Sequence, residues 1–281
     1  MFSIKFRFII IHLLILFLFS NCDTKKKIDD NLQMQFACYS LAICTNDRGT
    51  KFGMVGDSWT DLVFGVNAIE TLRVQLEKYH NYQIKGATLG GTTLSGAYQR
   101  GAHIQTIDEA GPSIKYVLVS LGGNDLQFTP SAYVNNFSAE KQSRFLTISG
   151  LIKDMITSGN AYKLNKWGGD PLIWIFHGYD YPNPDNANGS TSCRDTLKAA
   201  GFTDTQVDVD MKTLLDDYNS LLYNLVFQIE NFRYINLRST LGTSVSEKQY
   251  MFDCIHPNSI GFRLLGNRYV LSLEAYTRNE R

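Results

Sequence analysis

The chain has 281 residues, of which 44% are hydrophobic and 12% aromatic, and its 27 basic side chains balance its 27 acidic ones. A disordered chain would contain fewer aromatic residues, and a nucleic-acid binder that relies on phosphate contacts would be basic. We therefore expect a folded protein with no nucleic-acid partner. The length fits one or two domains, since a single α/β domain often reaches about 250 residues.

The N-terminus has the features of an export signal. Lys5 and Arg7 precede an apolar run over residues 8–19, which is shorter than the roughly 20 residues of a membrane span. Cys22, just after this run, resembles the cysteine of a bacterial lipoprotein signal, which implies that it becomes acylated and anchors the protein to a membrane of the cell envelope. A plain secretory signal with a secreted or periplasmic product, or a buried N-terminal strand, is the alternative, and fatty-acid labelling distinguishes them.

We expect a signal peptide over residues 1–21, a tether and N-terminal extension over 22–50, and a folded domain over 51–281. Besides Cys22, the chain has cysteines at positions 38, 44, 193 and 254. An even number in an exported protein favours disulfides, and we predict that Cys38 pairs with Cys44 and Cys193 with Cys254. The sequence permits three connectivities, and free buried thiols are the alternative.

From residue 51 onward, short apolar runs alternate with longer stretches of helical period. This order predicts α/β architecture with a mostly parallel sheet of about five strands. The expected strands cover 52–55, 82–89, 116–121, 172–176 and 232–237. Helices are predicted from the apolar stripe between Leu62 and Tyr79, over 140–156, from the stripe between Met211 and Ile229, and over 259–276. The stretch 179–202 is rich in turn-forming residues and is expected to be a long functional or mobile loop.

Ligands of open α/β sheets bind beyond the carboxyl ends of the strands. Glycines and polar residues follow the first three predicted strands, and another polar group precedes the last helix. Because these segments open onto one edge of the sheet, we expect residues far apart in sequence to meet there. The segments are 56–58, 90–93, 122–125 and 253–256.

Ser58 is the candidate nucleophile of this edge, because a strand-to-helix turn favours developing negative charge. Its alternative role is that of a helix N-cap, since residues 58–61 fit the S/T-x-x-D pattern. His256 can take the serine proton, and Asp253 can hold the imidazole tautomer. The alternative for this pair is a purely structural role, in which Asp253 forms a turn and His256 only makes its hydrogen bonds within the fold.

An acyl-transfer site also needs donors for the oxyanion. The backbone N–H groups of Ser58 and Gly91 and the side-chain amide of Asn124 are available, although Gly90 fits as well as Gly91. A flexible turn at Gly91 and an Asx-turn at Asn124 are the structural alternatives.

Together the four segments resemble the blocks of the SGNH (GDSL) hydrolases, a family of esterases and lipases. The resemblance covers about residues 51–275 and implies a flavodoxin-like, three-layer α/β/α sandwich. It implies that Ser58 is the nucleophile, His256 the general base and acid, and Asp253 the orienting carboxylate. Ser58, Gly91 and Asn124 would form the oxyanion hole. Trp59 departs from the family pattern, where a small or aliphatic residue often follows the serine.

The sequence therefore predicts a serine esterase with no cofactor and no metal. There is no G-x-S-x-G elbow, P-loop, dinucleotide fingerprint or H-E-x-x-H motif. An acyl lipid, an acetylated sugar or cell-wall glycan, or transfer of the acyl group to another alcohol remains open. A non-catalytic binding lipoprotein of the envelope, with the 179–202 stretch as its contact region, is the rival from another class.

Overall fold

The computed structural model describes residues 51–62, 69–127, 129–186 and 192–277, which belong to one compact unit, Asp47–Arg281. The predicted signal peptide and tether lie outside the described residues, together with Cys22, Cys38 and Cys44. Within the described part, no helix has both the length and the apolar run that crossing a bilayer requires.

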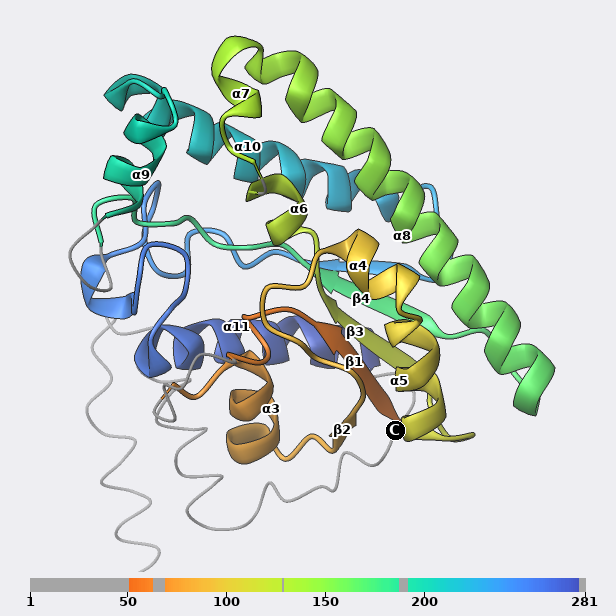
Figure 1. Cartoon of the computed structure of the whole chain (residues 1–281). Coiled ribbons are helices and arrows are strands. Elements are labelled where there is room, and N and C mark those ends of the chain that lie inside the picture. Colours follow the sequence, from red (N-terminus) through yellow and green to blue (C-terminus); the bar gives the residue numbers. More distant parts are fainter. Residues whose placement is uncertain (1–50, 63–68, 128, 187–191, 278–281) are drawn as a thin grey trace, which may run out of the picture. The chain divides into compact units, whose positions relative to one another are not determined.

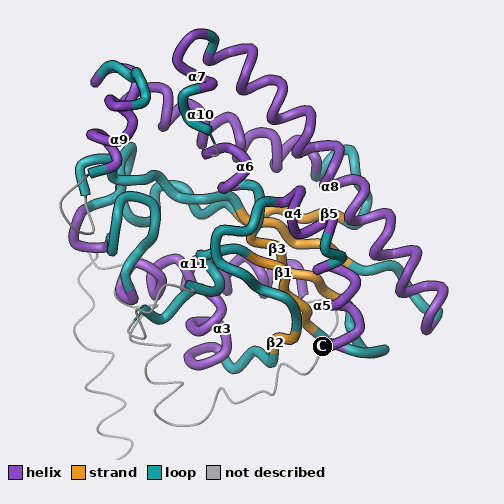
Figure 2. Tube along the Cα trace, in the orientation of Figure 1, coloured by secondary structure: helices purple, strands orange, loops and turns teal. Residues whose placement is uncertain are grey.

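A five-stranded parallel sheet forms the centre of this unit (Figures 1 and 2). Its strands are β1 (Phe52–Gly56), β2 (Ile84–Lys85), β3 (Tyr116–Ser120), β4 (Ile173–His177) and β5 (Phe232–Ile235), in the order β2-β1-β3-β4-β5. Every residue of β1 and β3 is buried, as continuous apolar runs in a sheet covered on both faces should be. This order is flavodoxin-like and confirms the predicted fold class.

Helices cover both faces of the sheet (Figure 1). On one face α3 (Leu72–His80) packs against α11 (Ser259–Thr277). On the other, α8 (Phe137–Trp167) packs against α5 (Ala102–Ala110) and α10 (Asp204–Leu225). Shorter helices lie in the connections: α4 (Leu94–Gln99), α6 (Gly123–Gln127), α7 (Ala132–Asn135), α9 (Cys193–Ala199) and the 3₁₀ turn η1 (Lys248–Tyr250).

Several predicted elements differ from the structure, among them the following three. The helix expected from Leu62 begins at Leu72, where the N-cap residue is Thr71. The strand expected over 82–89 keeps ladder pairing only at Ile84–Lys85, followed by a single bridge between Gly56 and Thr88. The expected loop 179–202 contains the helix α9, which starts at a capping box between Ser192 and Asp195.

The disulfide prediction is confirmed where the structure tests it. Cys193, the first residue of α9, is bonded to Cys254, and their Cα atoms are 6.0 Å apart. The bond joins two segments that are 61 positions apart in sequence. It therefore links the segment after β4 directly to the polar segment that precedes α11.

Candidate active site

Ser58 lies in a turn directly after β1, and Asp57 holds this turn. The backbone N–H of Trp59 donates to Oδ1 of Asp57 at 3.0 Å, and the N–H of Thr60 donates to the Asp57 carbonyl at 3.0 Å. The next described helix begins only at Leu72. Residues 58–60 form a hydrogen-bonded turn and residues 61 and 62 are not helical, so Ser58 is not the N-cap of a described helix, in contrast to the expected strand-to-helix turn.

Three side chains form a continuous chain of hydrogen bonds at the carboxyl edge of the sheet. Nε2 of His256 lies 2.8 Å from Oγ of Ser58, which is 198 positions away in sequence. Nδ1 of His256 lies 2.7 Å from Oδ2 of Asp253. Because an ionised carboxylate can only accept, the imidazole proton belongs on Nδ1, and Nε2 is left to accept the serine hydroxyl.

The Asp253 carboxylate is fixed by its own turn. Its Oδ1 accepts the backbone N–H groups of Ile255 at 2.9 Å and of His256 at 2.7 Å. Burial raises the pKa of Asp253, but the hydrogen bond and charge of His256, with the two amides, outweigh burial and hold that pKa below its ordinary value. Asp253 is thus an anion at neutral pH, ready to stabilise a protonated imidazole.

Asp57 is a fully buried carboxylate next to the serine, and its hydrogen bonds join neighbouring strands. The hydroxyl of Ser120 donates to its Oδ1 at 3.0 Å, and the hydroxyl of Tyr179 donates to its Oδ2. Burial raises the pKa of Asp57 to about 6, against the lowering effect of the hydrogen bonds from Tyr179, Trp59 and Ser120. These bonds tie the ends of β1, β3 and β4 together and fix the turn that contains Ser58.

The raised pKa of Asp57 predicts a pH-dependent contribution to stability. Since this pKa is about 6 in the folded chain and 3.8 ordinarily, the unfolded chain holds fewer protons between these values. The contribution is therefore fully present below about pH 4 and is lost as the pH rises through 6, by roughly 3 kcal/mol at 1.36 kcal/mol per pKa unit.

Asp57→Asn removes this titration. From pH 4 to pH 7, its free energy of unfolding should rise relative to that of the wild type by up to about 3 kcal/mol, measured by urea denaturation at both pH values. A difference between the two proteins that stays constant with pH would show that Asp57 does not titrate in this range.

Two of the candidate oxyanion donors, Gly91 and Asn124, lie close to one another. Nδ2 of Asn124 donates to the carbonyl of Thr92 at 2.9 Å, which places this amide against the turn that contains Gly91. Gly91 has φ +74°, a backbone conformation that favours glycine, and no atom lies within 4 Å of the position a Cβ would take. The N–H of Leu89 donates to the carbonyl of Gly56 at 2.9 Å, so this turn lies next to the serine turn.

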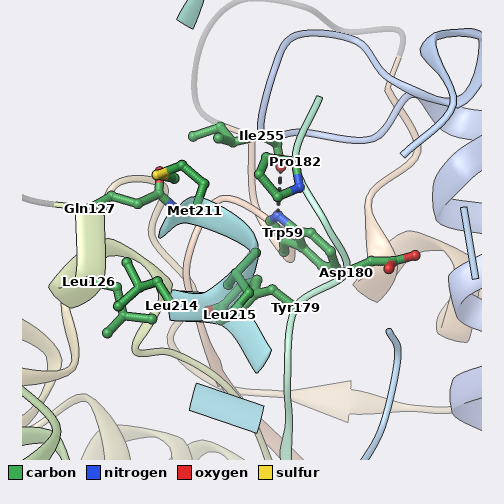
Figure 3. A pocket seen from close by; sticks show the side chains of 10 residues that line it. All are labelled: Trp59, Leu126, Gln127, Tyr179, Asp180, Pro182, Met211, Leu214, Leu215 and Ile255. Atoms are coloured by element: carbon green, nitrogen blue, oxygen red, sulfur yellow. Dashed lines mark hydrogen bonds between the residues drawn. The ribbon is translucent and has the colours of Figure 1, made fainter. Parts of the chain in front are cut away.

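A mostly apolar pocket is lined in part by the chain neighbours of Ser58 and His256 (Figure 3). Its empty space, counted with the solvent at its mouth, is about 400 Å³. Two of its lining residues, Trp59 and Ile255, are the chain neighbours of Ser58 and His256, and the indole N–H of Trp59 donates to the Ile255 carbonyl at 3.2 Å. The other walls are Leu126, Gln127, Tyr179, Asp180, Pro182, Met211, Leu214 and Leu215.

Trp59 also organises an aromatic cluster behind the site. Its ring stacks on His177 with centroids 5.9 Å apart and meets Tyr179 edge-on at 4.9 Å. Burial lowers the pKa of His177 to about 4, so this imidazole is neutral at physiological pH and packs within the aromatic cluster. Trp59, at which the chain departs from the pattern of the hydrolases that it resembles, thus forms one wall of the pocket.

Sequence reasoning missed the partners that hold the site in place. Ser120 and Tyr179 bind Asp57, and Asn186 donates to the Asp253 carbonyl. Their only signal in the sequence is their position, at the end of a predicted strand for Ser120 and in the predicted loop 179–202 for Tyr179 and Asn186. That position places them at the right edge of the sheet but does not say which side chain they contact.

No family model and no curated protein matches the chain. Several solved structures share its fold at low identity. The lipase Lip_vut3 from a goat rumen metagenome is 14% identical, with a TM-score of 0.55 over 79% of this chain and 96% of that one. An extracellular lipase from Streptomyces rimosus is 13% identical, with a TM-score of 0.52 over 81% and 99%.

A catalytic mutant of an acetylxylan esterase from Geobacillus stearothermophilus is 12% identical, with a TM-score of 0.50 over 80% of this chain and 94% of that one. At such identities the likeness concerns the fold alone. Described residues of this chain thus adopt the α/β fold that these lipases and this esterase share, which is the fold implied by the SGNH resemblance.

Proposed function

We propose that this protein is a serine ester hydrolase that cleaves carboxylic esters through an acyl-enzyme. The observation that carries the proposal is the hydrogen-bonded chain from Ser58 through His256 to Asp253, at the edge of the sheet where such folds bind ligands. The fold shared with two lipases and an acetylxylan esterase supports the same reaction class.

The geometry favours a specific sequence of proton transfers. Oγ of Ser58 attacks the ester carbonyl carbon while Nε2 of His256 takes the hydroxyl proton, and Asp253 stabilises the resulting imidazolium. The carbonyl oxygen becomes an oxyanion, for which the N–H groups of Ser58 and Gly91 and the amide of Asn124 are the donors. His256 then gives its proton to the leaving alcohol.

Water completes the cycle by the same route. His256 takes a proton from water, the hydroxide attacks the acyl carbon, and Ser58 is released with its proton restored. If another alcohol replaced water, the product would be a new ester, so an acyltransferase uses the same residues. An esterase that removes acetyl groups from sugars or cell-wall glycan is the other alternative within this mechanism.

The apolar pocket favours the acyl part of the ester as its occupant. Leu126, Leu214 and Leu215 are buried side chains on its walls, and the residues next to Ser58 and His256 line it too. An acyl chain of a few carbons can gain from these walls, at about 0.8 kcal/mol per buried methylene. A long chain would have to extend beyond them.

A series of nitrophenyl esters from acetate to palmitate tests the proposal. We expect hydrolysis with kcat/KM rising roughly fourfold for each methylene from acetate to butyrate and falling again for the longest chains. Activity confined to acetate would favour a deacetylase of sugars. A folded protein that hydrolyses none of these esters would support the non-catalytic binding lipoprotein instead.

Export and anchoring are part of the same proposal. The N-terminal pattern around Cys22 supports a protein that acts at the cell envelope, held to a membrane by an acylated cysteine, with a secreted or periplasmic form as the alternative. In that setting the ester substrate would be a lipid, a glycan or a small molecule outside the cytoplasm.

A further inference from the structure

Two short segments between β4 and α10 bind the turn that contains Asp253 and His256. We call these two segments, residues 182–186 and 192–195, the strap. On the basis of the proposed function, we propose that the strap positions His256 against Ser58, with Asn186 and the Cys193–Cys254 disulfide as its positioning contacts. The strap would then be part of the catalytic architecture and not a contact region for partners.

The turn is rigid within itself. The backbone N–H groups of Phe252 and Asp253 donate to the carbonyl of His256 at 2.8 and 3.3 Å. The Asp253 carboxylate in turn accepts the backbone N–H groups of Ile255 and His256. These bonds fix the Asp253 and His256 side chains relative to one another. They do not fix the turn relative to Ser58. One bond to the neighbour of Ser58 does so in part, from the indole N–H of Trp59 to the Ile255 carbonyl at 3.2 Å.

The strap supplies contacts that fix the position of the whole turn. The backbone N–H of Asn183 donates to the Cys254 carbonyl at 2.8 Å, and Nδ2 of Asn186 donates to the Asp253 carbonyl at 3.1 Å. Asn186 is buried, with 4% of its surface exposed. The disulfide adds a covalent link at Cys254, one residue from the carboxylate. Two of these contacts bind the backbone carbonyls of Asp253 and Cys254, and the third binds the Cys254 side chain, so all three lie between the two functional residues.

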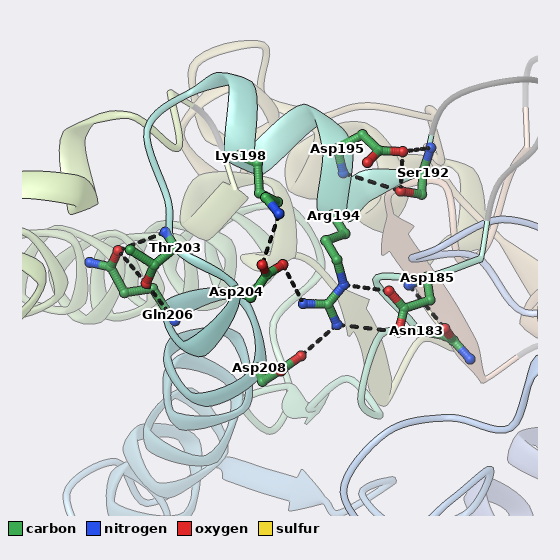
Figure 4. A network of polar contacts seen from close by, with 10 residues as sticks. All are labelled: Asn183, Asp185, Ser192, Arg194, Asp195, Lys198, Thr203, Asp204, Gln206 and Asp208. Carbon is green, nitrogen blue, oxygen red and sulfur yellow. Dashed lines mark hydrogen bonds and ion pairs between the residues drawn. The ribbon is translucent and has the colours of Figure 1, made fainter.

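The strap is in turn fastened to α10 (Figure 4). The guanidinium of Arg194 binds Asp185 within the strap and reaches Asp208 at 2.6 Å and Asp204 at 3.4 Å, both on α10. The backbone N–H of Arg194 also donates to the carbonyl of Pro184 at 2.9 Å, and this bond joins the two segments of the strap. A network of several carboxylates around one arginine holds its geometry better than an isolated surface pair.

The chemical consequence follows from the short bond between His256 and Ser58. A proton is transferred efficiently only when the two heavy atoms stay within hydrogen-bond reach, 2.8 Å here. A displacement of about 1 Å at a reacting group can cost about 10²-fold in rate. A turn that is free to shift as a unit would therefore lose kcat while its internal bonds remain intact.

Two variants of the full chain test the strap. Asn186→Leu keeps the branched shape of the side chain but removes the donor to Asp253, and Cys193→Ser removes the covalent link. We expect each to lower kcat by about 10- to 100-fold on a nitrophenyl ester, with KM within about twofold of the wild type. The downfield proton NMR signal of His256 Nδ1–H should broaden or shift in both. Lys166→Gln, which removes an exposed ion pair with Asp108, is the control and should leave kcat and the signal unchanged.

The outcomes separate this inference from the proposed function. Variants that fold and keep the wild-type kcat and NMR signal would overturn the strap, as would a loss confined to KM. If Cys193→Ser does not fold, Asn186→Leu decides alone. A folded wild type without any turnover would overturn the proposed function itself, whereas turnover that survives both substitutions overturns only the positioning role.

Discussion

Replacing Ser58 by alanine is expected to lower kcat for ester hydrolysis by about 10⁴-fold or more. The substitution removes the only atom of the hydrogen-bonded chain that can attack the carbonyl, Oγ, which lies 2.8 Å from His256 Nε2. The oxyanion donors and the pocket stay in place, so a small residual rate and near-normal substrate binding should remain. Steady-state kinetics on a short-acyl nitrophenyl ester measures this directly.

The matched control for Ser58→Ala is Ser95→Ala, which alters a half-buried hydroxyl on the short helix α4. Both variants should unfold in urea close to the wild-type midpoint, because Ser58 has no capping role in a helix. If the Ser58 variant kept a tenth or more of the wild-type kcat, the nucleophile would have to lie elsewhere, and the proposed mechanism would fail.

Asp253→Asn is expected to lower kcat by a similar factor, about 10⁴-fold, at neutral pH. The amide oxygen of asparagine can still accept the N–H groups of Ile255 and His256, so the turn keeps its shape. The amide NH₂ would face Nδ1 of His256, which must then accept and cannot hold the proton. The other tautomer places N–H on Nε2, toward Ser58, where a proton acceptor is needed.

The loss of kcat in Asp253→Asn should come from the changed tautomer of His256 and not from a loss of stability. The Asp253→Asn variant should keep its free energy of unfolding within about 1–2 kcal/mol of the wild type, since only one hydrogen bond is altered. Asp108→Asn, which changes an exposed carboxylate paired with Lys166, should leave kcat unchanged. Equal losses in both variants would mean that the activity responds to net charge or stability, and not to the tautomer of His256.

Much of the site was predictable because parallel strands all end at one edge. Once β1 and β3 were recognised as buried apolar runs, the residues after them had to face the same side of the sheet. Asp253 and His256 are three positions apart, a spacing at which one turn can present both side chains. The meeting of Ser58 and His256 across 198 positions follows from this topology together with the last helix packing beside α3.

The parts that escaped prediction have weak local signals. The helix α4 spans six residues, too few for a helical period to show. The helix α8 continues past Ile156 to Trp167 through a largely polar stretch and ends at Gly168, where φ is +71°. The stretch 179–202 has loop composition, yet a disulfide, a capping box and the Arg194 network hold its described residues, 179–186 and 192–202. Composition reports turn residues but not what their side chains bind.

The covalent reaction of Ser58 with a fluorophosphonate, mapped by mass spectrometry of the digested protein, tests the central claim most directly. The account predicts one phosphonyl group per chain on the peptide that contains Ser58, with fluoride displaced by Oγ. Labelling should be absent in Ser58→Ala and strongly slowed in Asp253→Asn. A demonstrably folded protein that gains no label, or gains it at another residue, would contradict the account.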